Sequence, residues 1–141
     1  MAMIVKAKPS ADFLYVRIDG DFSLDEATRT FGMVIDLVVA NNSRRVLFDG
    51  RGITGDPSPI QRFYYAAFAS DSVNLLRANG WIQDPPRFAY VLHEPVLDPL
   101  RLGQIVAKKR GMNLKAFDNI DEAIRWLRLK PKDVKYMTAP Q

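Results

Sequence analysis

The sequence predicts one α/β domain, with a mixed, mostly parallel five-stranded sheet packed by about four helices. Its 141 residues are a usual size for a single domain. Apolar residues alternate in some segments and recur at helical spacing in others, giving the order β-β-α-β-α-β-α-β-α. Repeated strand–helix alternation favours parallel pairing. The first two strands are too close in sequence for a crossover helix, so we expect them to form an antiparallel hairpin.

The chain begins with two expected strands, Met3–Ala7 and Phe13–Ile18. In the second strand one face is wholly apolar, as alternation with period two predicts for a half-buried strand. A helix from Ser23 to about Ala40 follows. Ser23 and Glu26 have the spacing of a capping box, in which the serine hydroxyl and the glutamate carboxylate each accept a backbone N–H of the first turn.

The stretch Arg44–Phe63 is expected to organise the domain. It begins with a short buried strand over Val46–Phe48, because this apolar run is followed at once by turn-forming residues. The glycine-rich segment Gly50–Gly55 predicts a loop. Ser58 suits the N-cap of the next helix, and a proline at the first helical position suits the helix Pro59–Ala78. This corner between strand and helix is where we expect a functional surface.

Four more elements complete the expected domain. They are a strand over Arg87–Leu92, a helix over Pro99–Arg110, a strand over Leu114–Phe117 and a helix over Asp118–Leu129. We therefore expect the domain to cover residues 1–129. Residues 130–141 are expected to be a polar, mobile tail, unless Val134, Tyr136 and Met137 dock on a partner.

Composition excludes several classes of function. The chain has no cysteine, which excludes disulfides and thiolate chemistry, and its single histidine excludes a site of several histidines. The net charge is +4, but the basic residues are spread out, so no specific nucleic-acid role is predicted. No apolar run approaches the roughly 18 residues of a membrane span, and the N-terminus lacks a secretory signal. We expect a cytoplasmic protein without a cofactor.

The chain resembles the STAS-like fold group, which contains bacterial anti-sigma-factor antagonists. The resemblance rests on the element order over Ile4–Leu127 and on the strand ending Val46-Leu47-Phe48-Asp49 before a small-residue loop and a helix. It also rests on the closing pattern Phe117-Asp118…Glu122-Ala123-Ile124…Trp126-Leu127. That pattern is similar to a STAS-like branch that shares its topology with CRAL-TRIO lipid-binding domains.

The resemblance implies a role for Ser58. In anti-sigma-factor antagonists, a partner kinase phosphorylates a serine in an Asp-Ser-Ser-Gly motif at this helix start. Phosphate there gains from the helix dipole and adds nearly two negative charges to a docking surface. This sequence has Gly55-Asp56-Pro57-Ser58-Pro59 instead, so the acid and one serine remain while prolines flank the serine. Ser58 is thus a candidate phospho-acceptor, and otherwise a plain N-cap.

The resemblance and the corner together predict a non-enzymatic protein-interaction module, whose partner is another protein or a second copy of the chain. Aromatic residues crowd the second helix and cannot all share one face completely. They form one wide buried face in the core, or else part of this helix presents an exposed patch or lines a cavity. An alternative function is the binding of a lipid-like or other small apolar ligand. The expected partner or ligand surface consists of Asp49, Gly52, Thr54, Asp56, Ser58, Tyr64, Tyr65 and Phe68.

Two patterns with catalytic or cofactor chemistry are weaker. Gly50–Gly55 fits G-x-G-x-x-G, but it follows the third strand rather than the first, and Asp56–Pro59 separates it from the helix, so a flexible turn is favoured. His93 and Glu94 are neighbours on a strand end and point to opposite faces, which disfavours an acid–base pair. A hydrolase or transferase function lacks an identifiable nucleophile and base.

A metal site is a further weak hypothesis. Asp49, Asp56 and Asp84 could gather at the carboxyl ends of the strands, where open α/β sheets bind ligands and where carboxylates could hold a divalent cation. Their spacing is not diagnostic of a metal site, so none is predicted.

Overall fold

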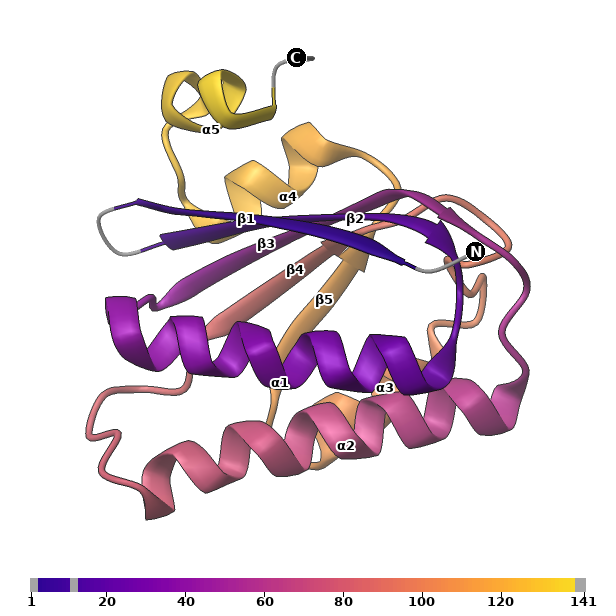
Figure 1. Ribbon diagram of the computed structural model, residues 1–141, viewed down its shortest axis with the longest axis horizontal. Coiled ribbons are helices and arrows are strands. Elements are labelled where there is room, and N and C mark those ends of the chain that lie inside the picture. Colours follow the sequence, from indigo (N-terminus) through magenta and orange to yellow (C-terminus); the bar gives the residue numbers. More distant parts are fainter. Residues whose placement is uncertain (1–2, 11–12, 139–141) are drawn as a thin grey trace.

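The computed structural model describes residues 3–10 and 13–138, and its side chains are described up to residue 134. In this part of the chain, strands and helices alternate after an initial hairpin (Figure 1). The strands are β1 (Ile4–Ser10), β2 (Phe13–Asp21), β3 (Arg45–Thr54), β4 (Arg87–Val91) and β5 (Asn113–Phe117). The helices are α1 (Leu24–Asn41), α2 (Pro59–Ala78), α3 (Leu102–Lys109), α4 (Ile120–Leu127) and α5 (Pro131–Thr138).

The five strands form one mixed sheet in the order β1-β2-β3-β4-β5. β1 pairs antiparallel with β2, and every later pair is parallel. Because consecutive parallel strands lie side by side and crossovers are right-handed, α1, α2 and α3 all cover one face of the sheet (Figure 1). α4 and α5 lie on the opposite face. The predicted fold class is confirmed.

Each face of the sheet has its own hydrophobic core, and alternation along the strands assigns side chains to one or the other. Leu14, Val16 and Ile18 of β2 pack toward α1 and α2. Phe13 and Tyr15 pack toward α4. On the α1–α2 side the core is built around four aromatic rings, with Phe48 and Tyr90 stacked at a centroid distance of 4.4 Å. The four rings are Phe31, Phe48, Phe88 and Tyr90.

The glycine-rich stretch differs from the prediction, because most of it belongs to a strand. β3 continues to Thr54 and pairs with the end of β2, beyond a bulge between Arg17 and Asp19. Gly52 permits this pairing, since a Cβ there would lie 1.8 Å from the carboxylate of Asp19. Only Gly55, with φ of +111°, sits in the turn that leads to α2. The flexible loop expected over Gly50–Gly55 is therefore wrong.

Two other elements differ from expectation. α3 begins at Leu102 rather than at residue 99, because the Asp98 carboxylate accepts the amides of Leu100 and Leu102 across an intervening turn. Residues 131–138, expected within a polar tail, form α5, and Val134 is fully buried in the α4-side core. Pro131 ends the preceding segment but also suits the first position of a new helix. The side chains of Tyr136 and Met137 lie outside the described residues.

No helix in the described part of the chain combines the length and the apolar character that crossing a bilayer requires.

Candidate functional site

The start of α2 is fixed by its own capping residues. The Ser58 hydroxyl accepts the amide of Gln61 at 3.2 Å, and the Gln61 side chain accepts the amide of Ser58 at 2.9 Å. This is the reciprocal capping box, with Pro59 in the first turn, where a missing N–H costs nothing. Ser58 is exposed. The predicted N-cap is confirmed, and the hydroxyl is accessible, as a phospho-acceptor must be.

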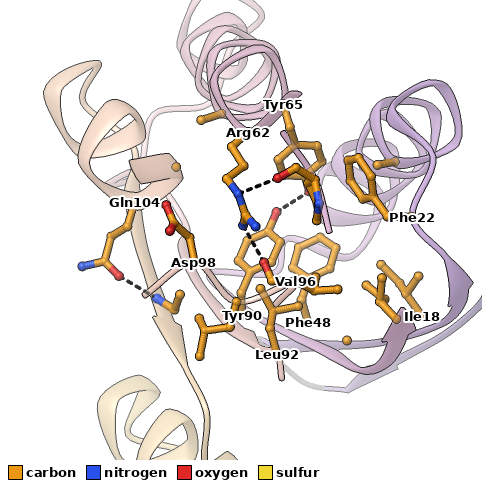
Figure 2. A pocket seen from close by; sticks show the side chains of 18 of the residues that line it. Ile18, Phe22, Phe48, Arg62, Tyr65, Tyr90, Leu92, Val96, Asp98 and Gln104 are labelled. Carbon is orange, nitrogen blue, oxygen red and sulfur yellow. Dashed lines mark hydrogen bonds between the residues drawn. The ribbon is translucent and has the colours of Figure 1, made fainter. Parts of the chain in front are cut away.

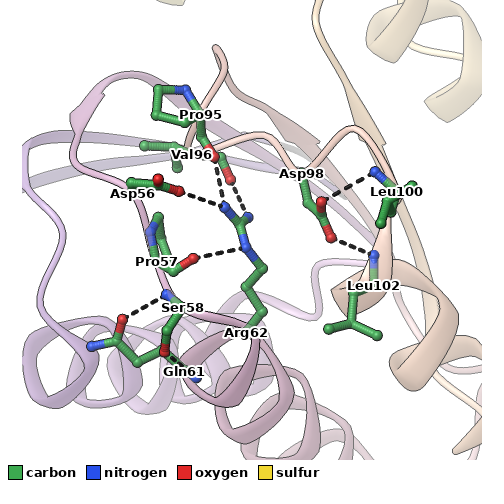
Figure 3. A network of polar contacts seen from close by, with 10 residues as sticks. All are labelled: Asp56, Pro57, Ser58, Gln61, Arg62, Pro95, Val96, Asp98, Leu100 and Leu102. Carbon is green, nitrogen blue, oxygen red and sulfur yellow. Dashed lines mark hydrogen bonds and ion pairs between the residues drawn. The ribbon is translucent and has the colours of Figure 1, made fainter.

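Arg62 ties the start of α2 to the loop after β4 (Figure 3). Its guanidinium donates to the carbonyl oxygen of Pro57 at 3.0 Å and to those of Pro95 and Val96 at 2.7 Å each. The carboxylate of Asp56 lies 3.5 Å away, but it is largely exposed, so this ion pair adds little. Three carbonyl acceptors on one half-buried cation hold the loop after β4 against the start of α2.

The outer face of α2 carries large apolar side chains in solvent. Ile60, Tyr64 and Phe68 recur every four residues and are 68%, 59% and 40% exposed. Leu75 continues the same line and is 59% exposed. Exposed apolar side chains are unremarkable when scattered, but several large ones on one face of a helix are typical of an interaction surface. The exposed Asp71 lies on the same face, between Phe68 and Leu75. We call Ile60, Tyr64, Phe68 and Leu75 the outer stripe.

Tyr65 points the other way, into the domain. Its ring meets Phe31 edge to face at 6.2 Å, and its hydroxyl lies 2.6 Å from that of Tyr90 on β4. Burial raises the pKa of Tyr65, and burial together with the neighbouring Tyr65 raises the pKa of Tyr90 well above 10.0. Both hydroxyls are therefore protonated at neutral pH. Tyr65 does not belong to the same surface as Tyr64 and Phe68, contrary to the grouping that the sequence predicted.

The Tyr65–Tyr90 pair lies in a pocket at the carboxyl edge of the sheet, between α1, α2 and α3 (Figure 2). The pocket has a volume of about 140 Å³. Its walls are almost entirely apolar, with Ile18, Phe22, Phe48, Leu92, Leu97 and Leu114 among them. Carboxyl edges of parallel strands are where open α/β sheets bind ligands. Arg62, Asp98 and Gln104 reach the pocket, but each is bonded to backbone groups of the protein.

Asp49 lies on the opposite face of the sheet, so the structure removes it from the predicted surface. Its carboxylate is 4% exposed, accepts the Tyr15 hydroxyl at 2.7 Å, and receives two hydrogen bonds of 2.8 Å from Arg51. Burial pushes the pKa of Asp49 upward, but the bonds from Arg51 and Tyr15 and the Arg51 charge outweigh it, so the pKa is lowered. The hydrogen bonds of the Asp49 carboxylate are thus made within the protein, and its role is structural.

The remaining predicted residues lie around the corner itself. Gly52 and Thr54 are exposed in the last part of β3, where the Thr54 hydroxyl donates to the Asp21 carboxylate. Asp56 is exposed between β3 and α2. These three residues are near Ser58 in the chain but none of them lines the pocket. Their membership of a binding surface stays a prediction.

Neither the His93–Glu94 pair nor the three aspartates form a catalytic or metal-binding arrangement in the described residues. His93 and Glu94 are both exposed, and the His93 side chain has no hydrogen bond there. Asp84 lies before β4, at the amino end of the parallel strands, whereas Asp49 lies toward the carboxyl end. The hypothesis that these aspartates gather with Asp56 is therefore wrong. Within residues 3–10 and 13–134, no three histidine or acidic side chains are grouped as metal ligands.

Sequence reasoning missed Arg62 and Tyr90 as residues of this corner. Arg62 follows Ser58 by four positions, so it lies one turn into the helix and can reach back over its start, which is a local signal. Tyr90 gives no such signal, because its pairing with Tyr65 depends on how α2 packs across β4. That contact joins residues 25 positions apart and follows from the tertiary fold alone.

Solved structures with the same fold include two anti-sigma factor antagonists. The one from Mycobacterium paratuberculosis has a TM-score of 0.57 and 13% identity, over 90% of this chain and 95% of that chain. SpoIIAA in its unphosphorylated form has a TM-score of 0.55 and 7% identity, over 90% of this chain and 99% of that chain. No protein-family model and no curated protein matches the sequence. The resemblance to the STAS-like fold is confirmed, and identities this low establish the fold alone.

Proposed function

We propose that this chain is a non-enzymatic regulatory module that binds a protein partner through the outer stripe of α2. The observation that carries the proposal is the line of exposed side chains Ile60, Tyr64, Phe68 and Leu75. Tyrosine is enriched among the residues that dominate binding energy in protein interfaces. The STAS-like fold of anti-sigma factor antagonists supports the same class of function.

Ser58 of the capping box lies at one end of this stripe and is the position that we propose to be regulated. Ser58 is exposed and lies two residues before Ile60, at the N-cap of the helix. A phosphate there would add nearly two negative charges beside an apolar docking surface, and it would replace the hydroxyl that accepts the Gln61 amide. We infer that modification of Ser58 would change partner affinity without unfolding the helix, because phosphate also suits a helix N-terminus.

Photo-crosslinking tests the proposal. A photoreactive amino acid is placed at position 64 in the outer stripe and, as a control, at position 39, where Val39 is 56% exposed on α1. The expected result in cells of the source organism is one protein, or a second copy of this chain, captured at position 64 and not at 39. Equal capture at the two positions, or capture at neither, would overturn the assignment of the surface.

A second candidate function is the binding of a small apolar ligand in the pocket. The observation that favours it is an apolar cavity of about 140 Å³ at the carboxyl edge of the sheet. An engineered apolar cavity of roughly 150 Å³ stays dry and binds benzene. Pockets for drug-sized ligands span roughly 300–1,000 Å³, so this one suits a single ring or a short chain, and a long acyl chain would project from it.

A further inference from the structure

The pocket contains one polar feature that the protein itself does not use fully. The hydroxyls of Tyr65 and Tyr90 bond to each other at 2.6 Å, and neither has another hydrogen-bond partner among the described residues. A pair of neutral hydroxyls has two protons, and one bond between them uses only one. Whichever tyrosine accepts that bond keeps an O–H proton without an acceptor, in a site where Tyr90 is 8% exposed.

The surroundings of this spare proton restrict what could accept it. The nearby walls are carbon, from residues such as Phe48 and Leu92. The cation at the rim, Arg62, already donates to three carbonyl oxygens, and the carboxylate of Asp98 accepts two backbone amides. Arg101 also lines the pocket, and it donates to the carbonyl oxygen of Asp98. The described charged side chains that line the pocket are thus engaged with backbone groups, and none of them bonds to the two tyrosine hydroxyls. An ionised ligand seated against these hydroxyls would lack a bonded counter-ion there, and burying an unpaired charge in an apolar site is costly.

Resting on the second candidate function, we propose that the pocket binds a compact, neutral, one-ring molecule with a single oxygen, which accepts a hydrogen bond from the Tyr65–Tyr90 pair. The ring fills the apolar volume, and the oxygen takes up the unused hydroxyl proton. Since the hydroxyls remain protonated at neutral pH, the pair donates to the ligand and does not attract a cation. The pocket would thus select ligands whose oxygen lies next to the two tyrosine hydroxyls over apolar ligands of the same size.

Two ligands of equal size separate this proposal from simple apolar binding. Benzyl alcohol and ethylbenzene have the same number of heavy atoms and differ by a hydroxyl in place of a methyl group. Each is titrated into the isotope-labelled chain, and dissociation constants are taken from the amide shifts of pocket residues in ¹H–¹⁵N NMR spectra. The measured quantity is the ratio of the two constants, ethylbenzene over benzyl alcohol, which cancels effects common to both ligands.

The test variant removes both hydroxyls, as Tyr65→Phe with Tyr90→Phe. Replacing both partners of a buried hydrogen bond by apolar groups of the same shape is nearly neutral for folding, so this variant keeps the fold. Tyr64→Phe makes the same change on the neighbouring ring, which is 59% exposed on the outer stripe, and serves as the matched control. We expect the ratio to fall about two- to tenfold in the double variant, which is the usual effect of one hydrogen bond.

The outcomes separate two claims: that the pocket binds a small apolar ligand, and that the Tyr65–Tyr90 pair recognises its oxygen. A ratio that falls in the double variant and not in Tyr64→Phe supports the proposal. Binding of both ligands with an unchanged ratio overturns the role of the tyrosine pair and leaves the apolar ligand function standing. If neither ligand shifts the pocket amides, the ligand function itself fails, and the proposal fails with it.

Discussion

The two sides of α2 both carry apolar side chains, but they differ in exposure to solvent. The inner side packs Ala66, Ala69, Val73 and Leu76 against the sheet, each at most 5% exposed. The outer side carries Ile60, Tyr64, Phe68 and Leu75 in solvent. A helix that only covers a core is usually apolar on one face and polar on the other. Here the second apolar face has no partner among the described residues of the chain.

This difference shows how one helix can hold a fold together and still present a binding surface. The inner side is needed for stability, whereas the large side chains of the outer side keep 40–68% of their surface in solvent and belong to neither buried core. Tyr64 and Tyr65 make the point at neighbouring positions, one 59% exposed and the other bonded to Tyr90 inside the pocket. Selection for folding alone does not explain a line of large apolar side chains in solvent.

The strongest test of the comparison uses the neighbouring leucines, which lie on opposite sides of α2. Leu76→Ala should lower the free energy of unfolding by about 2–4 kcal/mol, because it leaves a cavity in the core. Leu75→Ala should change it by less than about 0.5 kcal/mol, because that side chain is 59% exposed. Urea denaturation of the two variants measures both values. Equal losses would mean that the outer stripe is part of the core.

The pH dependence of stability tests the inner side. Because burial raises the pKa of Tyr65 and of Tyr90 above 10.0, the unfolded chain loses these protons first as the pH rises. The free energy of unfolding therefore falls as the pH rises above 10. Below pH 10 the two hydroxyls do not make the free energy of unfolding depend on pH. Near pH 11, one unit above the unfolded pKa, the loss should reach about 1.4 kcal/mol for each hydroxyl that stays protonated in the folded state.

Chemical denaturation at pH 9 and at pH 11 isolates this contribution. The drop between the two pH values should be about 2–3 kcal/mol smaller in Tyr65→Phe/Tyr90→Phe than in the natural sequence. Tyr64→Phe is the control for a tyrosine outside the pocket and should leave the drop unchanged. An identical drop in all three proteins would show that the pair is solvated rather than buried.

A smaller effect is expected at the end of the helix, which both sides share. Ser58→Ala removes the hydroxyl that accepts the Gln61 amide and should cost about 1 kcal/mol of stability. Ser58→Asp restores an acceptor at the N-cap and should recover most of this loss, as judged by thermal melting at neutral pH. If Ser58→Asp is no more stable than Ser58→Ala, the capping account of this corner does not hold.

Much of the fold could be predicted from the sequence because its signals are local. The alternation in Phe13–Ile18 and the capping sequences at Ser23 and Ser58 each depend on a few neighbouring residues, and the structure confirms them. The extent of β3 through Gly52 was not predictable in the same way. It depends on how β3 pairs with β2 beyond the bulge, and that pairing overrides the preference of glycine for loops.

The candidate site shows where such local reasoning ends. Aromatic crowding on α2 left open a wide buried face, an exposed patch or a cavity wall, and it could not assign Tyr65 to the cavity. Asp49 was placed at the corner because it follows an apolar strand, and it faces α4 because alternation turns it to the other side of the sheet. Spacing along the chain locates a region, and only packing decides which way each side chain points.

The most direct test of the central claim is a calorimetric titration of the partner that crosslinking at position 64 identifies. Its affinity is measured for the natural sequence, for Tyr64→Ser with Phe68→Ser, and for Val39→Ser as an exposed control on α1. We expect the double variant to bind more than about tenfold more weakly, since central interface side chains each contribute over roughly 1 kcal/mol. Val39→Ser should bind like the natural sequence. Unchanged affinity in the double variant would contradict the claim that the outer stripe of α2 is the docking surface.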